Sequence, residues 1–164
     1  MPLVVTGFGP IDAPHRELAG CVADLSAAVR AREVSEVRGR VFLLTEKLAE
    51  HFSDEEVLMR RSGWSLLRPH ADAHGRLLSC LREFDRRIAR TGVCHDLANW
   101  GLNHLPEMIR HHCIVSDFGF AKFAMGLADD PSRKRSILHA RPGCSRAPAR
   151  RWGIAWTRRR QTVS

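Results

Sequence analysis

The feature that most constrains this chain is the spacing of its histidines and carboxylates about the predicted turns. His51 and Glu55 are four residues apart, and so are His70 and His74. On a helix, residues four apart lie on one face, one turn from each other. Between the two pairs, the segment SGWS at 62–65 places a glycine directly after a helix-forming run, which predicts a helix end. The sequence therefore predicts a hairpin of two helices.

The midpoint between the two pairs falls between residues 62 and 63, inside this predicted turn. Residues equidistant from the turn of an antiparallel hairpin face each other, so the two pairs meet at one height. The midpoint between His15 and the pair His51 and Glu55 falls near Val34. The midpoint between the pair His70 and His74 and the pair His112 and Asp117 falls near Gly92. Both midpoints lie in segments that predict turns. Side chains from four helices are therefore expected to converge at one level.

Helical end signals predict the bounds of these four helices. Asp12 is expected to be the N-cap of the first helix, with Pro14 in its first turn, and Asp96 the N-cap of the fourth. Pro106 should kink the fourth helix or move its start. The predicted helices cover residues 13–31, 37–61, 69–90 and 97–126. We expect an all-α fold without internal repeats.

The converging side chains form a candidate metal site. They are His15, His51, Glu55, His70, His74, His112 and Asp117. Imidazole suits iron, and a carboxylate can bridge two cations and offset their charge. Five imidazoles and two carboxylates in a helical core therefore indicate a two-iron site. Because a single helical histidine is more often a surface or core residue than a ligand, four histidines are given no metal role: His95, His104, His111 and His139.

The segments that carry these residues resemble the hemerythrin family, specifically its bacterial single-domain members (bacteriohemerythrin-like proteins). The matching segments are IDAPHREL around His15, HFSDEEVLM around His51 and Glu55, HADAHGRLL around His70 and His74, and HCIVSDFGFAKF around His112 and Asp117. The resemblance covers about residues 8–127. It implies an up-down-up-down four-helix bundle with a non-haem di-iron centre that binds dioxygen.

The resemblance also implies a role for each candidate ligand. Glu55 and Asp117 would bridge the two irons. Three histidines would complete one iron, namely His70, His74 and His112. Two would hold the other, namely His15 and His51. This second iron would have one ligand fewer, which leaves a coordination position for a diatomic gas. Val115 would line an apolar, dry pocket at that position.

His104 is the alternative to His112 as the last histidine ligand. Trp100 precedes His104 by four residues, which also fits the family's approach to that ligand. An aspartate would then be expected at position 109, which is isoleucine. Asp117, followed by aromatic residues, favours His112.

Residues next to the predicted ligands, and two departures from the family pattern, bear on the surroundings of the predicted site. Glu56 and His111 adjoin ligands in sequence and are expected to face elsewhere, since consecutive helical residues point about 100° apart. The chain departs from the family pattern at Cys113, where a bulky aliphatic residue is usual, and at Pro106. These departures bear on the shape of the pocket.

Charge divides the chain near residue 130. All 18 acidic residues precede residue 131, whereas residues 131–164 hold 10 Lys or Arg and no acid. We therefore expect a bundle domain over 8–127 and a disordered basic tail over 131–164. The tail has three interpretations: a dispensable extension, an arm that contacts nucleic acid or an anionic membrane surface, or sequence that is not native coding sequence.

Cysteine usage and hydropathy indicate the compartment. The five cysteines show no CxxC spacing, which argues against a disulfide framework and a zinc ribbon. The apolar runs are too short for a membrane span, and the first residues lack the pattern of a signal peptide. A cytoplasmic protein is the simplest expectation.

The ligand types also bear on reactivity. Ferritin-like di-iron sites use four Glu and Glu-x-x-His patterns, which are absent here, and fewer anionic ligands give less support to high-valent iron. We therefore expect reversible dioxygen binding by a carrier, store or scavenger rather than by an enzyme. The alternatives are a sensor of oxygen, nitric oxide or redox state, and a di-iron enzyme or iron-repair protein. The oligomeric state is not predicted.

Overall fold

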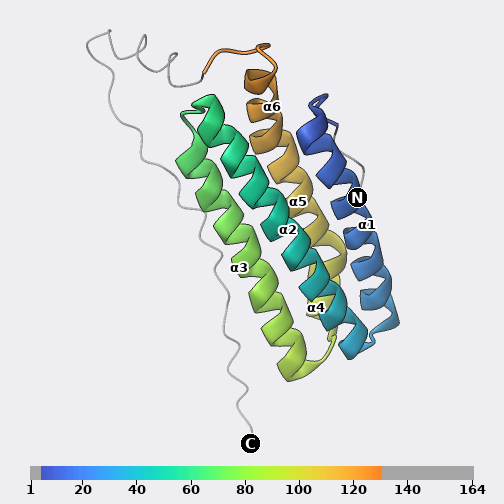
Figure 1. The fold of residues 1–164 in the computed structure, drawn as a ribbon. Coiled ribbons are helices and arrows are strands. Elements are labelled where there is room, and N and C mark those ends of the chain that lie inside the picture. The colour runs from blue at the N-terminus through green and yellow to red at the C-terminus, as the bar shows by residue number, and fades with distance from the viewer. Residues whose placement is uncertain (1–4, 131–164) are drawn as a thin grey trace, which may run out of the picture.

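In the computed structural model, which describes residues 5–130, four helical rods run antiparallel to one another (Figure 1). The first three rods are α1 (Gly9–Ala31), α2 (Val34–Ser62) and α3 (Leu67–Thr91). The fourth is one continuous run made of α4 (His95–Asn99), η1 (Trp100–His104), α5 (Leu105–His112), η2 (Cys113–Asp117) and α6 (Phe118–Ala124), where η marks a π-helical segment. The described residues contain no strand, so the predicted four-helix bundle is confirmed.

The turns between the rods fall at the predicted midpoints. Arg32 (φ 59°) and Gly63 (φ 72°) adopt left-handed backbone conformations at the ends of α1 and α2, and Gly92 (φ 69°) ends α3. The Gly63 N–H donates to the carbonyls of Arg60 and Met59, which closes the end of α2. Glycine accepts this conformation without the steric cost of a Cβ. The α2–α3 turn lies at the same end of the bundle as the start of α1 (Figure 1).

The predicted N-cap of the first helix is wrong. Helix α1 begins at Gly9, before the predicted start, so Asp12 lies inside its first turn. The Asp12 carboxylate accepts hydrogen bonds from Thr6 N (2.7 Å), Thr6 Oγ1 (2.8 Å) and Gly7 N (3.0 Å). Burial alone would raise the pKa of Asp12, but these bonds outweigh burial and hold the pKa below its usual value. Asp12 therefore secures the segment before α1 instead of capping the helix.

Pro106 does not end the fourth rod, because the helix widens just before it. The Leu105 N–H donates to the Trp100 carbonyl, five residues back, which defines the π-helical segment η1. Proline removes a helical N–H, and its ring clashes with the carbonyl four residues earlier. A wider turn ahead of Pro106 provides room for that ring, so the rod continues through α5.

The same π-helical segment brings the fourth rod close to its neighbours. A Cβ at Gly101 would lie 2.8 Å from Phe84 Cζ and 3.3 Å from Val29 Cγ2. Both side chains are buried, and Phe84 also packs on the Trp100 ring at a centroid distance of 4.7 Å. Glycine at position 101 therefore permits the close approach of η1 to α1 and α3.

Two apolar clusters fill the bundle, one on each side of a polar layer. The larger cluster includes Val22, Leu44, Leu81 and Ile109 and reaches the α1–α2 turn. The smaller cluster lies near the α2–α3 turn and consists of Ile11, Met59, Trp64, Phe120 and Ala121. Among the described residues, no helix is long and apolar enough to span a membrane. The basic tail predicted for 131–164, with its suggested nucleic-acid or membrane contacts, lies outside the described residues.

The packing of Gly101 leads to a stability prediction. We expect Gly101→Ala to lower the free energy of unfolding by about 1–3 kcal/mol, because the added methyl overpacks the core against Phe84. Gly39→Ala is the matched control: Gly39 is exposed in α2, and a Cβ there meets nothing within 4 Å. The control should stabilise the protein by about 0.5–1 kcal/mol. Urea denaturation measures both changes, and equal effects would refute the close-packing argument.

Candidate metal centre

One layer of the bundle interior is polar. Within residues 5–130, the buried polar side chains other than the hydrogen-bonded pair Thr6 and Asp12 are the predicted ligands, and each is at most 6% exposed. They are His15, His51, Glu55, His70, His74, His112 and Asp117, and they come from all four rods. Ionisable side chains are rarely buried unless they are paired or bind a metal. The layer therefore requires partners for its charges.

Five of these side chains form one compact group. Each offers a nitrogen or oxygen atom, and these atoms all lie within 4.8 Å of one another. His70 Nε2 is 3.2 Å from Glu55 Oε2 and 3.3 Å from Asp117 Oδ1. His74 Nε2 is 3.3 Å from Glu55 Oε2, and His112 Nε2 is 2.9 Å from Asp117 Oδ1. Three imidazoles and two carboxylates thus surround one position.

A second group adjoins the first and shares Asp117 with it. His15 Nε2 lies 3.1 Å from Asp117 Oδ2 and 3.5 Å from Cys113 Sγ. These three residues again offer ligand atoms within 4.8 Å of one another. The ring of His51 packs edge-on against the ring of His15 at 5.0 Å, and His51 Nε2 is 4.0 Å from Glu55 Oε2. The second group is therefore the looser of the two.

Several atoms in the layer are crowded but make no hydrogen bond of acceptable geometry. Among the described residues these include His51 Nε2, Glu55 Oε1, His74 Nε2, His112 Nε2 and Asp117 Oδ1. Leaving a buried polar atom unsatisfied costs about 1–3 kcal/mol. Imidazole nitrogens and carboxylate oxygens are also the ligand atoms that iron accepts. The layer therefore has the composition and the unsatisfied atoms of a metal site.

The two carboxylates stay anionic despite their burial. Burial opposes ionisation of Glu55, but the hydrogen bond from His70 outweighs it and lowers the pKa of Glu55. The pKa of Asp117 lies well below its usual value, since its close contacts with His112 and with other histidines outweigh burial. Burial lowers the pKa of His51, whereas the contacts of His70 with both carboxylates overcome burial and raise its pKa to about 9. The layer thus presents negative charge that a cation would offset.

Comparison with known proteins agrees with this geometry. The family model described as the Hemerythrin HHE cation binding domain matches residues 6–123, a range that contains every predicted ligand. The chain belongs to the hemerythrin family. It is also similar to myohemerythrin of Sipunculus nudus, with 28% identity over 114 residues, which cover 67% of this chain and 79% of that protein. No solved structure matches the chain.

In this hemerythrin domain, a π-helical segment brings His112 and Asp117 together. In a regular α-helix, residues five apart point about 140° away from each other. In η2, however, the Phe118 N–H donates to the Cys113 carbonyl five residues back, so one turn holds more residues. Regular helical periodicity does not predict this widening, although the five-residue spacing of His112 and Asp117 is its signal in the sequence. Such π-bulges occur frequently at functional sites.

An aromatic ring packs against the histidines from within the core. Phe52 stacks on His74 with a centroid distance of 3.8 Å and an interplanar angle of 6°. The same ring meets His112 edge-on at 5.6 Å, and only 3% of Phe52 is exposed. Phe52 therefore holds two imidazoles in place and keeps water away from that side of the layer.

The prediction that Glu56 faces away from the site is wrong. Glu56 Oε1 lies 2.8 Å from Nδ1 of His74. A carboxylate on the second ring nitrogen fixes the orientation of a ligand histidine and makes the other nitrogen more basic. Glu56 cannot share the face of Glu55 on α2, yet it reaches a ligand on α3. The close packing of the two helices provides this contact.

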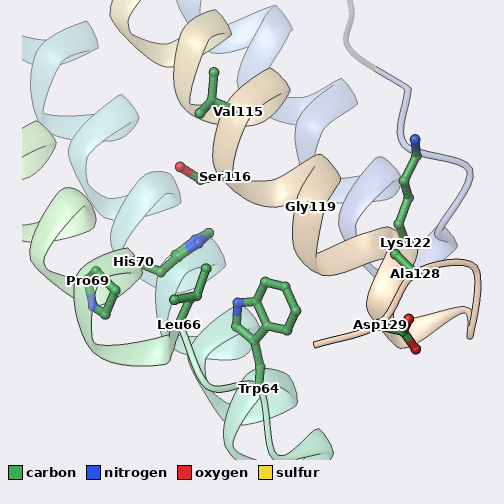
Figure 2. Close-up of a pocket in the computed structure, with 10 residues that line it drawn as sticks. All are labelled: Trp64, Leu66, Pro69, His70, Val115, Ser116, Gly119, Lys122, Ala128 and Asp129. Carbon is green, nitrogen blue, oxygen red and sulfur yellow. The ribbon is translucent and has the colours of Figure 1, made fainter. Parts of the chain in front are cut away.

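Val115 occupies a more open position than expected. Its side chain is 60% exposed, which differs from the dry pocket that the family resemblance implies. Val115 lines a surface pocket of about 460 Å³ that also includes Trp64, His70 and Lys122 (Figure 2). Figure 2 shows His70 on α3 and Val115 on η2 on different walls of this pocket. The pocket therefore reaches the edge of the polar layer at His70.

Three histidines outside the predicted ligand set are described by the structure, and all three lie at the surface. His95, His104 and His111 are exposed, and His139 lies outside the described residues. The choice of His112 over His104 thus agrees with the geometry, because His112 contacts Asp117 whereas His104 is exposed.

The contact between Glu56 and His74 leads to a prediction about metal affinity. We expect Glu56→Ala to weaken metal binding about 10–100-fold, as loss of a carboxylate behind a ligand histidine typically does. Asp54→Asn is the control, because Asp54 is an exposed carboxylate on the same helix. Competition with a chelator measures the affinity for ferrous iron. Equal affinities of the two variants would show that Glu56 has no role in orienting His74.

Proposed function

We propose that this hemerythrin domain holds two iron ions in its polar layer and binds dioxygen reversibly. The observation that carries the proposal is the shared carboxylate at the centre of the layer. Asp117 Oδ1 lies 2.9 Å from His112 Nε2, whereas Asp117 Oδ2 lies 3.1 Å from His15 Nε2. One carboxylate thus directs its two oxygens to two different groups of ligands, as a bridge between two cations requires.

The assignment of ligands follows the two groups. One ion would be held by three histidines, namely His70, His74 and His112. The other would be held by His15 and His51. Glu55 would join Asp117 as the second bridge, since its Oε2 lies 3.2 Å from His70 Nε2 and 4.0 Å from His51 Nε2. All of these side chains are buried, which favours a centre with restricted access to water.

When bound by these imidazoles and carboxylates, iron would supply the electrons for reversible binding of a diatomic gas. The protein would restrict the centre to reversible binding and disfavour further oxidation chemistry. Two carboxylates among five histidines place less negative charge at the ions than a four-glutamate site does, so further oxidation is less supported. Phe52, Met59 and Phe120 place apolar surface on both sides of the layer. These features favour a binding protein over an enzyme, with nitric oxide as a second diatomic ligand of suitable size.

The first test is metal content. We expect about two irons per chain in protein from iron-replete cells, with a sharp loss in His74→Ala and in Glu55→Ala, because both residues belong to the compact group. His104→Ala is the control, since His104 is exposed. Elemental mass spectrometry measures the ratio. Stoichiometric zinc, or unchanged iron in both ligand variants, would contradict the assignment.

The second test concerns dioxygen. The reduced protein should gain a visible absorption band in air and lose it under vacuum, over several cycles, because the buried histidine-rich layer favours reversible binding. Ultraviolet-visible spectroscopy in a sealed cell follows both steps. A single irreversible conversion that releases hydrogen peroxide would favour an oxidising enzyme or a redox sensor instead.

A further inference from the structure

Cys113 places a thiol inside the polar layer. The side chain is 4% exposed, and its Sγ lies 3.5 Å from His15 Nε2. Together with Asp117, these residues form the second group of potential ligands, whose atoms lie within 4.8 Å of one another. The family pattern has a bulky aliphatic residue at this position, so the thiol is a property of this chain.

The distances in this group fit the ligands of a single ion. Metal–nitrogen and metal–oxygen bonds are about 2.0–2.2 Å and metal–sulfur bonds about 2.3 Å, so neighbouring ligands of one ion are about 3.0–3.6 Å apart. His15 Nε2 and Cys113 Sγ are 3.5 Å apart, and His15 Nε2 and Asp117 Oδ2 are 3.1 Å apart. Both separations fall in that range.

A second observation points to a ligand at the same place. His51 packs against the ring of His15 and is 4% exposed, and its Nε2 makes no hydrogen bond within the described residues. A buried imidazole nitrogen in this state, on a ring that packs against His15 and 4.0 Å from Glu55 Oε2, is expected where a cation binds.

The backbone explains how Cys113 can reach the second position. Consecutive helical residues point about 100° apart, so His112 and Cys113 face different directions. His112 Nε2 meets Asp117 Oδ1 in the compact group, while Cys113 Sγ meets His15 of α1. The two adjacent side chains of the fourth rod thus lie against the two different ion positions.

We infer that Cys113 is a sulfur ligand of the second metal ion, alongside His15, His51 and the shared carboxylates. The metal–sulfur bond forms as the thiol releases its proton to solvent, and no electron is transferred. This inference rests on the two-ion function proposed above. A thiolate is a softer ligand than imidazole, so it would shift the preference of the second position towards softer cations.

Cobalt(II) tests this inference because a sulfur ligand gives cobalt a near-ultraviolet charge-transfer band that histidine and carboxylate ligands do not give. The metal-free full chain is titrated with cobalt alone, as wild type, Cys113→Ala and Cys80→Ala. Cys80 is the matched control, since it is a partly buried free cysteine on α3 outside both ligand groups.

We expect the wild type and Cys80→Ala to develop the sulfur band with the second equivalent of cobalt. Cys113→Ala should lack the band and bind the second equivalent at least about 10–100-fold more weakly. That is the loss of affinity typically caused by removing a residue that only hydrogen-bonds to a metal ligand, so losing a ligand should cost no less. Cys113→Val fills the space of the thiol, so it should fold like the wild type and also lack the band. X-ray absorption should show a sulfur neighbour in the wild type and in Cys80→Ala but not in either Cys113 variant.

Two outcomes would overturn the inference, and they are distinguishable. If the wild type binds two cobalt ions without a sulfur band, Cys113 is not a ligand and the two-ion function stands. If the wild type binds fewer than two ions, the two-ion function fails and the role of Cys113 fails with it.

Discussion

The arrangement of this bundle depends on two carboxylates that have almost no contact with water. Glu55 is 1% exposed and Asp117 is not exposed at all, yet both remain anionic because histidines donate to them. Burying an unpaired carboxylate is very costly, so each must be met by cationic groups in the same layer. Those groups come from all four rods, which must therefore lie in one register relative to one another.

The polar layer is enclosed by apolar clusters, and this placement links metal binding to folding. Side chains such as Leu48 on one side and Ile11 on the other are fully packed, so little water reaches the layer to satisfy its polar atoms. An ion that binds the folded layer satisfies them and does not bind the unfolded chain as well. Such binding adds directly to the stability of the whole bundle.

The turns and the set of converging side chains could be predicted from spacing. In antiparallel helices, the number of residues between a side chain and the turn gives its level along the bundle. The π-helical segment η1 could not be predicted in this way, since it depends on room for Pro106 and on the close approach of Gly101 to Phe84. The contact of Glu56 with His74 and the exposure of Val115 depend on helix packing that sequence periodicity does not describe.

The shared position of Asp117 has a thermodynamic consequence. Because its two oxygens face different groups of ligands, a change at one position of the proposed two-ion centre would alter the charge and orientation of a ligand at the other. Occupancy of the two positions would then be linked, and such linkage is reciprocal: each ion changes the affinity for its neighbour by the same factor. A half-loaded centre would therefore have its own affinity, and the occupancy of one position could not be described without that of the other.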